Sequence, residues 1–298
     1  MKSFHFFKIF IYLVCCFSLF SCSKKTEILA SSLNLSAQAT INQTQSSSEK
    51  DFDKTIDFSK DQEKLINMLT TSPLPFSNAK GEASEIAQNI LNNKEAFLSD
   101  LRRVLKSDTD NLLIKVDKQT ALSADYKPTD LVHLGTEKDY WVYRNDLNLR
   151  IPVESSLAIM AQDAFKQGVK LVVSSSYRSY RYQNTVYNRI VGELGQAAAD
   201  RESARPGTSQ HQLGTVVDFG SITDDFANTK AGKWLAKNAA TYGWSLSFPQ
   251  NYENVTGYRW ECWHYRYIGV PAVQFQQKWF KNIQQYMMEF VYNWRKKD

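Results

Sequence analysis

Residues 209–219, Ser-Gln-His-Gln-Leu-Gly-Thr-Val-Val-Asp-Phe, place two metal-binding residue types beside a short apolar run. The run at Val216 to Phe219 predicts a buried strand, and Asp218 lies inside it. A carboxylate buried in such a strand costs free energy unless it is paired or coordinates a metal. Gly214 lets the chain turn between His211 and the strand. We therefore expect His211 and Asp218 to contribute to one site.

A second polar and aromatic cluster is Glu261-Cys262-Trp263-His264-Tyr265-Arg266. The chain has only four histidines, and two of them lie in these two clusters. A catalytic zinc site needs three protein ligands and one open position. His211, Asp218 and His264 would supply two imidazoles and one carboxylate. Because other divalent ions also accept these ligands, spacing alone leaves the identity of the metal open.

Glu261 precedes His264 by three residues and could lie beside the metal without binding it. There it could take a proton from the attacking water and return it to the leaving amine, a role that typically contributes about 10²–10⁴-fold in rate. Residues three apart on a regular strand face opposite sides, so we expect a bulge or bend near Cys262. We interpret Cys262 as a small apolar filler, because a fourth protein ligand would close the site to water.

Helical and strand-like patterns alternate through the rest of the chain without a regular strand–helix–strand repeat, which favours the α+β class. The predicted helices are Ser155–Gln167, Ser179–Leu194 and Phe226–Tyr242, and the predicted strands are Leu112–Val116, Val169–Ser174, Thr215–Phe219 and Trp260–Ile268. We expect a helical extension over residues 58–123 and a C-terminal amphipathic helix over 271–298. Two alternatives stay open. Residues 60–106 could form an interaction module that carries the function, and the C-terminal helix could contact a membrane.

The first 22 residues predict an export signal: Lys2 and Lys8 precede an apolar stretch, Ile9 to Phe20, that is short for a membrane span. The stretch ends at Leu19-Phe20-Ser21-Cys22, which resembles the lipobox of bacterial lipoproteins and implies a lipid on Cys22. Residues 23–57 are polar and predict a flexible tether. We expect an exported, membrane-anchored protein facing the periplasm or cell wall, with ordinary secretion as the alternative.

Charge and cysteine content indicate which classes of partner and cross-link to expect. The net charge of +5 is spread along the chain, and the only basic run is Arg295-Lys296-Lys297, so nothing indicates a nucleic-acid partner. With Cys22 lipidated and Cys15 and Cys16 removed with the signal, Cys262 would be the only remaining thiol. An intramolecular disulfide would then be impossible, and the fold would depend on its core. We expect a monomer.

Residues from about Tyr126 to Gly269 resemble the VanY-type D-alanyl-D-alanine carboxypeptidases, whose fold is shared with the hedgehog amino-terminal domain. The matching stretches are Pro128–Val132, Ser176–Ser179 with Gln183, Arg205–His211, Gly214, Asp218-Phe219, Thr256–Tyr258 and Glu261–Gly269. The resemblance covers roughly half of the chain. It implies a hedgehog/DD-peptidase-like domain over residues 124–270, with a small antiparallel sheet flanked by helices.

The resemblance also implies roles for individual residues. His211, Asp218 and His264 would bind one Zn²⁺ ion, and Glu261 would be the catalytic base. Arg178 would steady the substrate carbonyl as negative charge develops on it, which suits a guanidinium. Ser209 and Gln183 would hold the C-terminal end of the peptide. The implied substrate is the D-alanine end of a peptidoglycan stem peptide.

Three positions depart from the family pattern: Cys262 replaces a usual Pro, Val216 a usual Ala, and Ser247 an Arg that often precedes an aromatic-Pro pair. The last change could alter how a substrate carboxylate is recognised. Related activities on this fold leave two alternatives open: an L,D-carboxypeptidase or peptidoglycan endopeptidase, and a non-catalytic, zinc-containing wall-binding domain. The presence of Glu261 and Arg178 argues against the second alternative.

Overall fold

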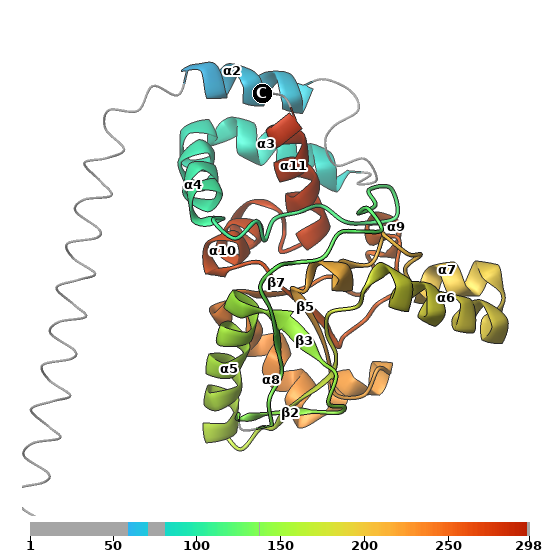
Figure 1. Cartoon of the computed structure of the whole chain (residues 1–298). Coiled ribbons are helices and arrows are strands. Elements are labelled where there is room, and N and C mark those ends of the chain that lie inside the picture. The colour runs from blue at the N-terminus through green and yellow to red at the C-terminus, as the bar shows by residue number, and fades with distance from the viewer. Residues whose placement is uncertain (1–58, 71–80, 137, 297–298) are drawn as a thin grey trace, which may run out of the picture. The chain divides into compact units, whose positions relative to one another are not determined.

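The computed structural model describes residues 59–70, 81–136 and 138–296, which belong to one compact unit, Phe58–Asp298. The predicted signal, Cys22 and the predicted tether lie outside the described residues. Within the described part of the chain, every helix is too short or too polar to cross a membrane. The described residues form one folded body (Figure 1).

A five-stranded sheet forms the centre of one half of this unit. Its strands are β2 (Tyr140–Val142), β4 (Leu171–Ser175), β5 (Val216–Phe219), β7 (His264–Tyr267) and β6 (Trp244–Leu246), in that order. All neighbours are antiparallel except the edge pair β2 and β4. A separate antiparallel pair joins β1 (Leu131–His133) to β3 (Asn148–Arg150). Segregated helices and a mainly antiparallel sheet confirm the α+β class.

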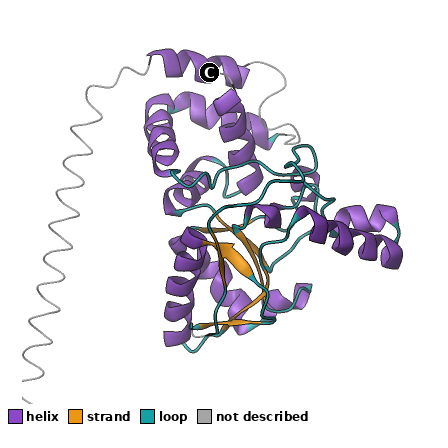
Figure 2. Ribbon diagram, in the orientation of Figure 1, coloured by secondary structure: helices purple, strands orange, loops and turns teal. Residues whose placement is uncertain are grey.

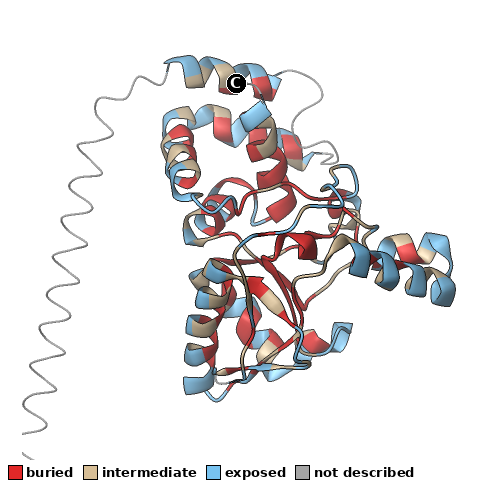
Figure 3. Ribbon diagram, viewed as in Figure 1, coloured by how far each residue is buried: buried red, intermediate tan, exposed pale blue. Residues whose placement is uncertain are grey.

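Helices α5 (Ile151–Lys166) and α8 (Lys230–Asn238) pack with this sheet in a shared apolar core. On α5, the buried positions Val153, Leu157, Met160, Ala161 and Ala164 recur at helical spacing and form one face. The predicted helix Phe226–Tyr242 is interrupted: α8 lies between two 3₁₀ turns, η3 (Asp224–Asn228) and η4 (Ala239–Tyr242). Figure 3 shows that the central strands β5 and β7 and the inner faces of the helices are buried.

A second apolar core lies among five helices, which we call the helical core: α2 (Ser59–Thr70), α3 (Glu82–Asn92), α4 (Lys94–Ser107), α10 (Val270–Trp279) and α11 (Gln284–Lys296). Figure 2 shows these helices grouped apart from the strands. The N-terminal helices thus share one core with the C-terminal ones. Deleting residues 60–106 would expose apolar side chains of α10 and α11, so this region is integral to the folded unit.

Two local predictions differ from the structure. Residues 112–116 do not form a strand: Arg266 Nη2 donates to the carbonyl oxygens of Leu112 and Ile114 in place of a neighbouring strand. The predicted single C-terminal helix is two helices, because Lys281 and Asn282 adopt positive φ angles that end the helical path between α10 and α11.

The remaining helices surround the site. Helix α6 (Tyr180–Leu194) follows β4 and is capped by Ser179, whose side chain accepts a hydrogen bond from Tyr182 N. It is followed by α7 (Gln196–Glu202) and, after an extended loop, by the 3₁₀ turn η2 (Gln210–Leu213). A short helix, α9 (Glu253–Thr256), precedes β7. These elements place the two polar clusters of the sequence beside each other.

Candidate metal centre

Three elements present the predicted ligands. His211 lies in η2, Asp218 on β5, and His264 at the start of β7, where it pairs directly with Asp218 across the ladder. Gly214 ends η2 with a φ of 68°, and a Cβ there would lie 2.9 Å from Leu131 Cδ2. Glycine is thus required both for the turn and for the close approach.

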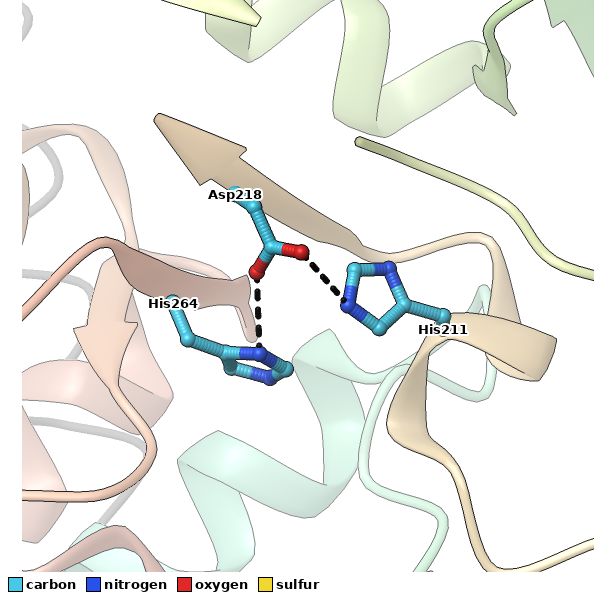
Figure 4. Close-up of side chains that lie close together, drawn as sticks. All are labelled: His211, Asp218 and His264. Carbon is cyan, nitrogen blue, oxygen red and sulfur yellow. Dashed lines mark ion pairs between the residues drawn. The ribbon is translucent and has the colours of Figure 1, made fainter. Parts of the chain in front are cut away.

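The three side chains converge on one point. His211 Nε2 lies 3.2 Å from Asp218 Oδ2, and His264 Nδ1 lies 3.1 Å from Asp218 Oδ1. Figure 4 shows the two imidazoles approaching the two oxygens of the same carboxylate. One ligand atom from each residue lies within 4.8 Å of the others, and all three residues are buried.

The donor set fits a divalent metal ion. Asp218 Oδ1 is buried and forms no hydrogen bond, although His264 Nδ1 is near it. A buried carboxylate oxygen without a hydrogen bond is costly, and a bound cation would remove that cost. Two imidazoles and one carboxylate form a three-ligand set of the kind that catalytic zinc uses. His211, Asp218 and His264 would therefore hold the ion.

The protonation states of two of these groups suit metal binding. Burial, reinforced by the positive Arg178, lowers the pKa of His211 to about 4. Burial alone would raise the pKa of Asp218, but the two imidazoles hold it well below its usual value. Burial also acts to lower the pKa of His264, but Asp218 and Glu261 outweigh it and raise that pKa to about 9. A neutral imidazole and an ionised carboxylate are the forms that bind metals.

Glu261 lies beside the ligand set without belonging to it. Its Oε2 atom is 3.3 Å from His264 Nδ1, and burial raises the pKa of its carboxyl group. The bend predicted near Cys262 is present as a turn, in which His264 N donates to Glu261 O at 3.2 Å. This turn brings Glu261 and His264 to the same side. The Cys262 thiol is buried in the apolar core and is not part of the ligand set.

Arg178 lies at the same centre. Its Nη2 atom is 2.7 Å from His211 Nε2 and donates to Asp218 Oδ2 at 3.0 Å. Its Nη1 atom donates to Gln183 Oε1 at 3.0 Å. A guanidinium held on both sides in this way is preorganised to stabilise negative charge.

The two predicted substrate-binding residues differ in their surroundings. Ser209 lines the cavity at the site, and its hydroxyl accepts a hydrogen bond from His211 N. Gln183 is buried and does not line the cavity; its amide donates to Ala204 O and accepts from Arg178. The observed contacts of Gln183 therefore position Arg178, and direct substrate contact by Ser209 stays a prediction.

The cavity has a volume of about 460 Å³ and extends from the ligand set along α6. Several lining residues were not predicted as site residues, including Arg144, Tyr182, Phe248, Tyr258, Arg259 and Trp263. Tyr258 and Trp263 lie inside the matching stretches Thr256–Tyr258 and Glu261–Gly269, which could have suggested them. Only the fold shows that the other four line the cavity. Ser247, predicted to influence recognition of a substrate carboxylate, is buried outside the cavity lining.

Comparisons with known proteins support the family that the sequence predicts. The family model described as VanY, D-alanyl-D-alanine carboxypeptidase, matches residues 146–270. The putative carboxypeptidase YodJ of Bacillus subtilis (strain 168) is 33% identical over 188 residues, covering 60% of this chain and 69% of YodJ. A D-alanyl-D-alanine carboxypeptidase of Enterococcus faecalis (strain ATCC 700802 / V583) is 28% identical over 220 residues, covering 70% of this chain and 77% of the relative.

Among solved structures, that of the LdcB LD-carboxypeptidase superposes with a TM-score of 0.52 at 32% identity, covering 58% of this chain and 87% of LdcB. The superposition supports the expected hedgehog/DD-peptidase-like fold. It covers most of LdcB but little more than half of this chain.

Proposed function

The chain belongs to the VanY family of D-alanyl-D-alanine carboxypeptidases, and from this premise we propose that it removes the terminal D-alanine from peptidoglycan stem peptides with one bound zinc ion. The observation that carries the proposal is the convergence of His211, Asp218 and His264 beside Glu261 in an accessible cavity. Relatives that are D-alanyl-D-alanine carboxypeptidases support the choice of substrate.

The residues divide the chemistry between them. A bound zinc ion supplies Lewis acidity, which polarises the scissile carbonyl and makes a water molecule easier to deprotonate. Glu261 accepts the proton of the attacking water and gives it to the nitrogen of the leaving D-alanine as the C–N bond breaks. Arg178 donates hydrogen bonds toward the carbonyl oxygen as that oxygen becomes negative. The raised pKa of Glu261 suits a group that must both accept and release this proton.

The test is product analysis on two defined substrates, a stem pentapeptide and a stem tetrapeptide, with zinc and with a chelator. We expect the pentapeptide to lose one D-alanine with zinc and to stay intact with the chelator. Loss of D-alanine from the tetrapeptide alone would identify an L,D-carboxypeptidase, and cleavage of a cross-linked dimer would identify an endopeptidase. If no substrate is shortened with zinc supplied, the catalytic proposal fails and the wall-binding alternative gains support.

We also propose that the protein is exported and anchored by a lipid on Cys22, so that the polar residues 23–57 let the peptidase reach the wall. The support is the sequence of the first 57 residues. Metabolic labelling with a radioactive fatty acid should label the wild-type chain but not a Cys22→Ala variant, which should leave the membrane fraction. Labelling of the variant, or of neither protein, would reject the anchor.

A further inference from the structure

The two imidazoles of the metal centre are oriented in different ways. His211 Nδ1 lies 2.7 Å from the backbone carbonyl oxygen of Ser176, a main-chain partner. His264 instead places Nδ1 toward Asp218 and Nε2 3.3 Å from the side-chain oxygen Oε1 of Gln210. With Nδ1 facing the ligand set, a metal-bound His264 would carry its proton on Nε2 and donate it to Gln210 Oε1. The orientation of His264 therefore depends on a side chain.

Gln210 is itself held in place by buried polar groups. Ser247 Oγ donates to Gln210 Oε1 at 2.8 Å and lies 3.3 Å from Gln284 Oε1. Gln210, Ser247 and Gln284 are exposed by only 7%, 2% and 1%. Gln284 is the first residue of α11, so this contact joins the 3₁₀ turn that carries His211 to the C-terminal helices.

The hydrogen bonds continue beyond Gln284. Its amide donates to Ser245 O at 3.4 Å, and Ser245 Oγ donates to Gln276 Oε1 at 3.0 Å. Gln276, on α10, donates in turn to both oxygens of Asn282 at 3.0 Å. A continuous polar chain thus runs from His264 to the turn between α10 and α11. Buried amides and hydroxyls contribute little to packing and need hydrogen-bond partners. This series of hydrogen bonds therefore needs an explanation other than core formation.

We propose that Gln210, held by Ser247 and Gln284, fixes the ring orientation and the Nε2–H tautomer of His264, and that the C-terminal helices thereby set the metal affinity of the site. Gln210 acts as a positioning residue: it is not a metal ligand, and it acts on the metal through His264. Such partners of metal-binding histidines commonly contribute about 10–100-fold to metal affinity. The inference rests on the metal site of the proposed function, but it does not depend on which peptide is cleaved.

The experiment measures zinc affinity of the purified full chain by competition with a chromophoric chelator, together with the visible absorption spectrum of the Co²⁺-substituted protein. Gln210→Met keeps the side-chain length and removes the acceptor, so we expect affinity to fall about 10–100-fold and the Co²⁺ bands to shift. Gln210→Glu restores an acceptor oxygen and should recover most of the affinity. Ser247→Ala and Gln284→Met should each cause a smaller loss in the same direction.

Gln212→Met is the matched control. Gln212 is a buried glutamine in the same 3₁₀ turn, but its amide donates to the carbonyl oxygens of Ser123 and Tyr126, away from both imidazoles. This variant should lower the unfolding temperature yet keep zinc affinity and the Co²⁺ spectrum. The proposal is overturned if Gln210→Met binds zinc as tightly as wild type, or if Gln212→Met loses as much affinity. Should Gln210→Met fail to fold, unchanged affinity in folded Ser247→Ala would overturn it instead. Absence of peptide hydrolysis in every protein would reject the proposed function alone.

Discussion

The helical core and the metal centre bury side chains of opposite kinds. In the helical core, the Phe97 ring lies with its centroid 5.0–5.2 Å from those of Phe275, Trp279 and Phe290, and the packing needs no charge. In the metal centre, two buried imidazoles contact a buried carboxylate, which also pairs with the partly buried guanidinium of Arg178. Apolar burial stabilises a fold without a ligand, whereas clustered buried charges need partners. Stability and catalysis should therefore respond to different substitutions.

The largest difference between the effect on turnover and the effect on stability is expected at Glu261. Glu261→Gln keeps the size of the side chain and removes the base, so turnover should fall by about 10²–10⁴-fold. Zinc affinity and the unfolding temperature should stay close to wild type, because Glu261 is outside the ligand set. The measurement is the rate of D-alanine release from the pentapeptide. Glu253→Gln, which alters an exposed partner of Arg201, is the control and should stay active. Unchanged turnover in Glu261→Gln would exclude it as the base.

The opposite response is expected at Phe97, which is fully buried in the helical core. Phe97→Ala leaves a cavity and should lower the free energy of unfolding by about 3–5 kcal/mol. The folded fraction should still bind zinc with wild-type affinity. Denaturant titration measures the loss, and Phe165→Ala, at a half-exposed position on α5, should change stability by only about 0.5 kcal/mol or less. A zinc affinity that falls with Phe97→Ala would show that the apolar packing of the helical core, and not only the Gln284 contact, acts on the metal centre.

Metal removal tests whether zinc binding stabilises the fold independently of the helical core. Zinc at about 100 times its dissociation constant should raise the free energy of unfolding by about 2.7 kcal/mol, because it binds only the folded chain. The same increment should be found in Phe97→Ala and be absent in His211→Ala, which lacks one ligand. Thermal unfolding with zinc and with a chelator measures it. Equal increments in all three proteins would mean that zinc binds elsewhere.

The sequence was sufficient where a chemical requirement is local. A carboxylate in an apolar strand predicted that Asp218 and His211 share one site, and the spacing of Glu261 and His264 predicted the bend at Cys262. The structure has this convergence and this bend, and the catalytic role of Glu261 stays a prediction. The sequence was insufficient where the partner is distant. The segment 112–116 is strand-like in composition, yet its carbonyl groups bind Arg266 across 152–154 positions of sequence.

The same limit applies to two residues near the site. Gln183 belongs to a motif that suggests substrate contact, but the fold turns its amide toward Arg178. Ser247 departs from the family pattern, but only the fold shows that its partners are Gln210 and Gln284, each 37 positions away. Residue type predicts chemistry, whereas the choice between two polar partners requires the tertiary structure.

The smallest effect is expected at the ion pair that joins α2 to α4. Arg102 Nη2 lies 2.5 Å from Asp61 Oδ2, and both side chains are about one-third exposed. Solvent-exposed pairs of this kind contribute about 0–1 kcal/mol and weaken with salt, so Arg102→Met should change the free energy of unfolding by no more than this.

Leu65→Ala on α2 removes a fully buried side chain and should lower the free energy of unfolding by about 2–5 kcal/mol. Denaturant titrations at low and high salt distinguish the two contributions. Arg102→Met could lower the free energy of unfolding as much as Leu65→Ala does, with salt reducing the loss. In that case α2 is held by charge. The contrast between an apolar helical core and a polar metal centre would then not extend to α2.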